Sequence, residues 1–207
     1  MNSIHKRNIL IIAEGYEEKP YIDKILSFPN INKDVYHIFP AVNAKGSGNI
    51  FARYQYEFQR NFYDLILIFC DADKGSEEFL TLVDKIGAFF IDKKSAIEVF
   101  VFANPVTLQI VLSHFGEVNI NNISKKNNAP LVEALTGIKN YDAKDEQIRE
   151  LISKINFQSL SDFKIRLKNI SSDFKDIPST NFLTFLERFE QEDSSWIDAI
   201  LSLMNNK

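Results

Sequence analysis

Two aspartates at the end of an apolar run are the residues best suited to chemistry in this sequence. The segment LILIFCDADKG places Asp71 and Asp73 directly after residues 65–70. Side chains two residues apart leave an extended backbone on the same side, and paired carboxylates suit Mg²⁺ or Mn²⁺. Such carboxylates repel each other, so they need a cation or a basic neighbour such as Lys74. An acidic loop that turns at Gly75 is the other interpretation, but a position after a strand favours the metal site.

A second acidic group follows the first apolar run of the chain. Glu14 comes directly after residues 8–13, and Gly15 permits a sharp turn there. Parallel strands can bring their carboxyl ends together at one edge of a sheet, so we expect Glu14 near the aspartate pair. Glu17 and Glu18 also suit the first turn of a helix, where the helix dipole favours acidic side chains. Glu18 remains a candidate for an additional metal ligand.

The loop NAKGSGN, residues 43–49, is a candidate phosphate site. Its backbone N–H groups, together with Lys45 and Ser47, can hold a phosphate at the start of a helix. The P-loop pattern GxxxxGK[ST] is absent, and an ordinary surface loop is the competing interpretation. Lys45, Arg53 and Arg60 can line one basic edge beside this loop. His114 is interpreted as a capping or core residue and not as a base.

The elements that must position these residues alternate along the first half of the chain. Apolar runs at residues 8–13, 35–39, 65–70 and 97–103 predict strands, separated by helical patterns. Such alternation predicts a Rossmann-like, mainly parallel sheet flanked by helices, although the strand order cannot be deduced. We expect an α/β domain over residues 1–116, a polar linker over 117–128, and a C-terminal extension over 129–207 that is entirely helical and packs on the core.

Composition excludes several classes of protein. The chain has 207 residues, of which 45% are hydrophobic, and its net charge is −4, so a general nucleic-acid coat is excluded while a local basic groove is not. Cys70 is the only cysteine, which excludes a disulfide framework within one chain. No apolar run approaches the length of a membrane span. We therefore expect a cytoplasmic protein with no membrane association.

Three motifs together resemble the topoisomerase–primase (TOPRIM) fold. That family carries a glutamate after its first strand and an Asp-x-Asp pair after its third. The segment AEGYEEKPYIDKI is similar to the opening of TOPRIM nucleases of the OLD and RloB-like groups, and VFANPVTLQIVLSHFG resembles an RloB-like signature. The resemblance covers about the first 116 residues. The matching positions are Glu14, Glu18, Asp71, Asp73, Asn104, Pro105, His114 and Phe115.

The resemblance implies Mg²⁺- or Mn²⁺-dependent cleavage of DNA or RNA in bacterial defence, often beside an ATPase or a restriction partner. Glu14 would then be a general acid/base or a ligand, and Asp71 and Asp73 would hold the metal. Lys74 is a candidate for neutralising charge in the transition state. One departure is Leu108, which occupies the place of a glutamate that RloB-like proteins usually carry.

Two alternatives stay open. The first is a catalytically weak TOPRIM-like subunit that docks to an ATPase or a nuclease, or to a second copy of itself; Leu108 and the acidic net charge favour it. The second is a phosphatase with a DxD nucleophile. It is less favoured because Gly75 replaces the usual small β-branched or hydroxyl residue and because Glu14 would have no role.

Overall fold

A mostly parallel sheet forms the centre of the computed structural model, which describes residues 6–73 and 75–205. The strand order is β2-β1-β4-β5-β6, and the short β3 pairs with the carboxyl end of β1. All pairings in this sheet are parallel except that of β6 with β5. The strands are β1 (Arg7–Ala13), β2 (Tyr36–Ile38), β3 (Val42–Asn43), β4 (Leu65–Asp71), β5 (Phe100–Asn104) and β6 (Ser179–Thr180).

The central strands are uninterrupted apolar runs because helices cover both of their faces. Residues 9–13 of β1 and 65–70 of β4 are buried almost completely, as expected for parallel strands inside a sheet. The two strands are direct neighbours, with Ala13 paired to Phe69. Their carboxyl ends therefore lie side by side.

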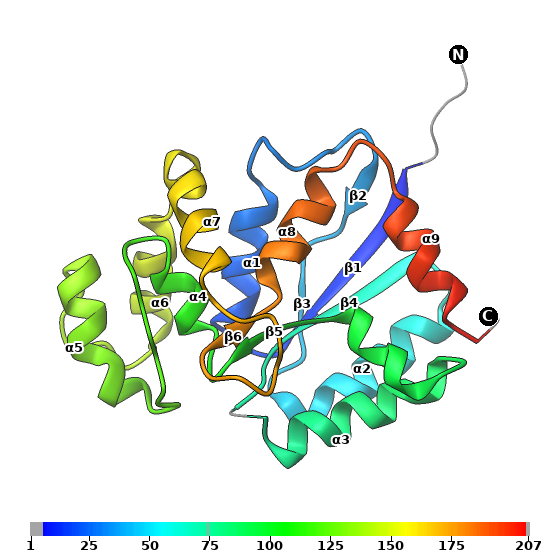
Figure 1. Cartoon of the computed structure of the whole chain (residues 1–207), viewed down its shortest axis with the longest axis horizontal. Coiled ribbons are helices and arrows are strands. Elements are labelled where there is room, and N and C mark those ends of the chain that lie inside the picture. Colours follow the sequence, from blue (N-terminus) through cyan, green and yellow to red (C-terminus); the bar gives the residue numbers. More distant parts are fainter. Residues whose placement is uncertain (1–5, 74, 206–207) are drawn as a thin grey trace.

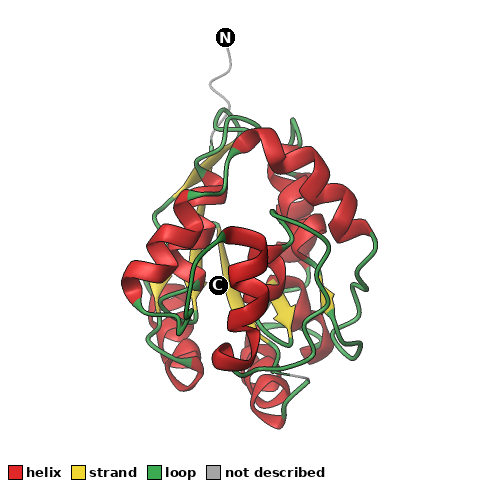
Figure 2. Ribbon diagram, turned by 90° about the vertical axis from the view of Figure 1, so that its left-hand side faces the viewer, coloured by secondary structure: helices red, strands yellow, loops and turns green. Residues whose placement is uncertain are grey.

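Helices lie on both sides of the sheet (Figures 1 and 2). In Figure 1, α2 and α3 lie below the sheet, whereas α1 and α8 lie above it. The helices are α1 (Glu18–Leu26), α2 (Ser47–Gln59), α3 (Glu77–Ile86), α4 (Leu108–Leu112), α5 (Lys125–Thr136), α6 (Asp145–Ser153), α7 (Leu160–Lys168), α8 (Phe182–Glu190) and α9 (Ser195–Ser202). Within the described part of the chain, no helix is long and apolar enough to cross a bilayer.

Aromatic side chains join the C-terminal extension to the α/β core. Phe182 of α8 lies 5.4 Å from Tyr21 of α1 and 5.7 Å from Phe69 of β4, measured between ring centroids. On the opposite face, Phe79 of α3 packs 5.7 Å from Phe100 of β5. Burial of rings of this size contributes strongly to stability, so the extension shares the hydrophobic core of the sheet.

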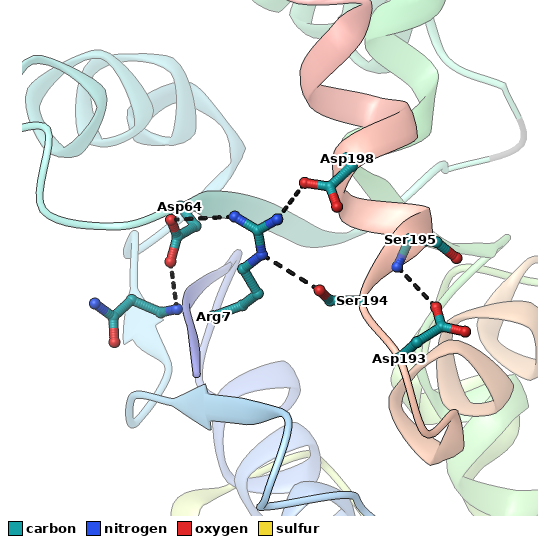
Figure 3. Close-up of polar contacts among 7 residues, drawn as sticks. Arg7, Asp64, Asp193, Ser194, Ser195 and Asp198 are labelled. Atoms are coloured by element: carbon teal, nitrogen blue, oxygen red, sulfur yellow. Dashed lines mark hydrogen bonds and ion pairs between the residues drawn. The ribbon is translucent and has the colours of Figure 1, made fainter. Parts of the chain in front are cut away.

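An ion-pair cluster holds the last helix against the first strand (Figure 3). Arg7, at the start of β1, pairs with Asp198 of α9 and with Asp64 ahead of β4, and its Nε–H donates to Ser194. The second oxygen of Asp64 accepts the backbone N–H of Asn8 at 2.7 Å. The amino end of the sheet is therefore connected to the C-terminal helix.

The mixed α/β class with a mainly parallel sheet is as the sequence predicts, but three local predictions differ. The expected strand over 97–103 begins only at Phe100, because residues Lys93–Val99 form a 3₁₀ helix that packs against α3. Helix α5 already begins at Lys125, inside the expected linker. The extension is not entirely helical, because β6 adds an antiparallel strand to β5.

Candidate functional site

Glu14 and Asp71 are joined by a hydrogen bond across the ends of the two central strands. The Oε2 atom of Glu14 accepts the backbone N–H of Asp71 at 3.0 Å, and the Glu14 N–H donates to the carbonyl of Phe69 at 2.9 Å. Both contacts follow from the parallel pairing of β1 with β4. Glu14 therefore lies beside Asp71 at the carboxyl ends of neighbouring strands.

The next strand along the sheet fixes one oxygen of Asp71. The backbone N–H and the hydroxyl of Thr107 both donate to Oδ1 of Asp71, at 2.6 Å and 2.7 Å. Thr107 follows β5, which pairs with β4 through Asp71 and Ala103. The Asp71 carboxylate is therefore fixed from beyond β5, whereas the Asp71 backbone N–H is bound by Glu14 at the end of β1.

Asp73 lies in a tight turn beyond β4. Its φ of 44° falls in the left-handed region, where aspartate is better tolerated than most residues. Its N–H donates to the carbonyl of Pro105 at 3.1 Å, and Gly75, with φ of 70°, donates to the carbonyl of Ala72 at 2.7 Å. The turn costs some backbone strain, a feature that is common at functional sites.

These carboxylates line one cavity of about 380 Å³ at the carboxyl end of the sheet. The first turn of α2, with Ser47, and the side of α3 that runs from Ser76 to Lys85 form its other sides. The described charged side chains of the lining are five carboxylates and one ammonium group. They are Glu14, Asp71, Asp73, Glu77, Glu78 and Lys85.

Burial and like charges raise the pKa of both aspartates. For Asp71, desolvation raises the pKa well above its usual value, Glu18 and Glu14 raise it further, and the Thr107 hydroxyl opposes them. For Asp73, burial and then Glu78 raise the pKa. Charged carboxylates are thus disfavoured here unless a cation offsets them.

Glu18 is close enough to Asp71 to raise its pKa, but it is not part of the cavity lining. It is buried in the first turn of α1, and a Cβ at Gly15 would lie only 2.9 Å from its Oε2 atom. The neighbouring Glu17 is also buried and accepts the hydroxyl of Tyr141 at 2.9 Å. Neither glutamate therefore lines the cavity, and Glu17 contacts the C-terminal extension through Tyr141.

The other candidates from the sequence fall in different places. Ser47 lines the cavity at the start of α2, whereas Lys45 is exposed outside the lining, with its N–H bonded to Asn43 Oδ1 at 2.6 Å. Lys74 lies outside the described residues. His114 is buried, stacks 3.7 Å from Phe163 and contacts the Tyr21 hydroxyl, so it is a core residue as expected.

The donor set of the cavity fits a hard divalent cation. Among the described residues, no three His, Cys, Asp or Glu side chains are already placed to hold one metal ion. Mg²⁺ does not need such a cage, since it is usually bound by one or two carboxylates, waters and substrate phosphate. Glu14, Asp71 and Asp73 supply oxygen donors of that kind.

Thr107 is a site residue that the sequence analysis missed. Its signal was a hydroxyl three positions beyond a strand that runs parallel to β4. Leu108, which stands at the place of the RloB-like glutamate, is buried at 1% exposure. Gln109 beside it bonds Val118 and Ile120, so it anchors the segment that follows α4.

Comparisons with known proteins do not add to this geometry. No family model, no curated protein and no solved structure matches the chain. The site must therefore be interpreted from its own residues.

Proposed function

We propose that the protein is a Mg²⁺- or Mn²⁺-dependent nuclease that cleaves phosphodiester bonds at the cavity between β1, β4, α2 and α3. The observation that carries the proposal is the position of Glu14, Asp71 and Asp73 around one cavity at the carboxyl end of a parallel sheet. Ligands of open α/β sheets bind at this end. The resemblance of the same residues to the RloB-like TOPRIM nucleases supports the choice of substrate.

The charge of the cavity supports a role for a cation. Five described carboxylates with one lysine would repel a phosphodiester. When bound, a divalent cation polarises the phosphate and stabilises the attacking and leaving oxygens. Asp71 and Asp73 are the residues that would hold it.

The protein groups supply orientation and proton transfer. Thr107 fixes one oxygen of Asp71, which limits the positions that the other oxygen can take. Glu14, bonded to the Asp71 N–H, lies where a carboxylate can hold or move a proton at the cavity. Ser47 and Gly48, in the first turn of α2, line the same cavity, and the first turn of a helix favours a phosphate oxygen.

The experiment is a cleavage assay on labelled single-stranded DNA and RNA with Mn²⁺ or Mg²⁺. We expect Asp71→Asn and Glu14→Gln to lower the rate by about 100-fold or more, since each acts on the transition state. Asp84→Asn, an exposed position on α3, is the matched control. Unchanged cleavage by the Asp71→Asn, Asp73→Asn double variant would overturn the proposal.

A second candidate is a docking subunit with little chemistry of its own. The observation that favours it is the burial of Leu108 in the core, so that position contributes no carboxylate to the cavity. Under this alternative the pure protein cleaves nothing, and Asp71→Asn still binds an ATPase or nuclease partner. Cleavage by a reconstituted system that is lost with Asp71→Asn would exclude it.

A further inference from the structure

A stripe of basic and aromatic side chains runs along the exposed side of α2, away from the cavity. Asn49, Arg53, Tyr56 and Arg60 are spaced by four, three and four residues, which places them on one face of the helix. We call this set the α2 stripe. Ser47 and Gly48 of the same helix line the cavity, so the stripe begins where the candidate site ends. At a rise of about 1.5 Å per residue, it extends about 16 Å.

A buried glutamate of the same helix holds the two arginines of the α2 stripe in place. Glu57 is buried, with only 1% of its side chain exposed, and its two oxygens bind Arg53 at 2.8 Å and Arg60 at 3.2 Å. Both arginine side chains remain partly exposed, at 40% and 50%. A guanidinium carries five N–H donors, so each can bind a further acceptor while it holds Glu57.

Tyr56 projects between the two arginines. Its ring lies 5.6 Å from the Arg53 guanidinium and 5.7 Å from that of Arg60, and the residue is 54% exposed. An exposed aromatic ring between two guanidinium groups combines a stacking surface with charges that attract phosphates. This combination is suited to an unpaired nucleic-acid strand, because a base inside a duplex has no free face for stacking.

We propose that the α2 stripe binds a single-stranded nucleic acid and leads it to the cavity, with a base on Tyr56 and phosphates on Arg53 and Arg60. The inference rests on the proposed nuclease function and names its substrate as single-stranded. The acidic lining of the cavity is the reason why a basic surface beside it is needed. The strand needs cationic contacts outside a cavity whose described lining has five carboxylates.

The test is the binding of a fluorescein-labelled oligothymidylate or oligouridylate, about 20 nucleotides long, measured by fluorescence anisotropy in EDTA so that the strand stays intact. Replacing the arginines alone would leave Glu57 buried without its partners, which destabilises a fold. The variant is therefore the triple Arg53→Gln, Glu57→Gln, Arg60→Gln. Its net charge falls by one unit, as does that of the control Lys168→Gln, at an exposed position of α7.

We expect the triple variant to weaken binding by at least about tenfold. The slope of log K against log[salt] should become less steep by about 1.4, because two phosphate contacts on a single strand are lost. Tyr56→Ala should weaken binding about tenfold, whereas Tyr56→Phe keeps the ring and the affinity. Glu57→Gln alone should not weaken binding. No binding by the wild type, or equal binding by the triple variant and Lys168→Gln, would overturn the inference.

The same variants separate this inference from the proposed function. Cleavage by the wild type that is lost with Asp71→Asn but unchanged in the triple variant contradicts the inference and leaves the nuclease proposal standing. Binding that depends on the α2 stripe without any cleavage supports the inference and contradicts the nuclease proposal. Tyr56 is exposed, so its variants test the stripe even if the triple variant fails to fold.

Discussion

Thr107 donates two hydrogen bonds to a single oxygen of Asp71, one from its backbone N–H and one from its hydroxyl. The hydroxyl can be removed by a substitution that keeps the shape of the side chain. It is also the contact that opposes the rise in the pKa of Asp71 caused by burial, Glu18 and Glu14. Thr107 therefore positions Asp71 and favours its charged form.

The first prediction concerns this contact. Thr107→Val keeps the shape and the N–H bond but removes a hydrogen bond to a charged group, which is worth about 1.5–3 kcal/mol. We expect the Mn²⁺ concentration needed for half-maximal cleavage to rise about tenfold or more. Thr107→Ser keeps the hydroxyl, so it should need the same Mn²⁺ concentration as the wild type. Identical metal dependence of Thr107→Val and wild type would contradict this role.

The second prediction tests whether Glu18 takes part in the site. A Cβ at Gly15 would lie 2.9 Å from the Glu18 carboxylate, so Gly15→Ala must displace the end of that side chain without deleting its charge. If Glu18 assists the site, Gly15→Ala and Glu18→Gln should both weaken the rise in melting temperature produced by Mn²⁺. If neither variant changes that rise, Glu18 is not a ligand, and Glu14 with the aspartates remains the donor set.

The third prediction concerns pH and buried His114. Burial, and then the charge of Arg166, lower the pKa of His114 to about 3. The unfolded chain, in which histidine has a pKa of about 6.5, therefore binds a proton first as the pH falls. This contribution to stability is complete above pH about 6.5 and is lost towards pH 3, by up to about 1.4 kcal/mol per pH unit.

His114→Gln should remove this part of the slope, measured as the free energy of unfolding by urea at several values of pH between about 4 and 7. The variant also changes the contact with the Tyr21 hydroxyl, so its absolute stability is not informative and only the slope is compared. His37→Gln, at an exposed position, is the control. An unchanged slope in His114→Gln would show that another group causes the acid sensitivity.

The central part of the fold and of the site could be predicted from the sequence, because both depend on local patterns. Uninterrupted apolar runs predict the buried strands β1 and β4, and an acidic residue directly after each run predicts where Glu14 and Asp71 lie. That β1 and β4 are neighbours does not follow from either run. It is a property of the strand order, which gives the contact between Glu14 and Asp71.

Other features depend on contacts that are distant in the sequence. Ser179 and Thr180 form β6 only because β5 offers them an open edge, and nothing in the two-residue segment itself predicts a strand. Residues 97–99 look like the start of a strand, yet β5 pairs with β4 only from Phe100 onwards. Thr107 was overlooked for the same reason, since its partner Asp71 is 36 residues away.

The last prediction compares two ways in which α9 is attached to the core. Asp198 pairs with Arg7 at the surface, with 57% of its side chain exposed, and exposed ion pairs contribute about 1 kcal/mol or less. Trp196 is buried, donates its indole N–H to the Tyr36 hydroxyl at 2.8 Å, and packs 5.4 Å from Phe189. Removing a buried tryptophan side chain costs about 3–5 kcal/mol.

We therefore expect Asp198→Asn to lower the free energy of unfolding by no more than about 1 kcal/mol, and Trp196→Ala to lower it by about 3 kcal/mol or more. Urea unfolding followed by circular dichroism measures both.

Because Glu14 directly follows the other end of β1, loosening of α9 should affect the site only if the whole strand shifts. If Mn²⁺ raises the melting temperature of Trp196→Ala as much as that of the wild type, the carboxyl end of the sheet is held independently of α9. A larger loss in Asp198→Asn than in Trp196→Ala would mean that the Arg7 cluster, and not the aromatic packing, attaches the last helix.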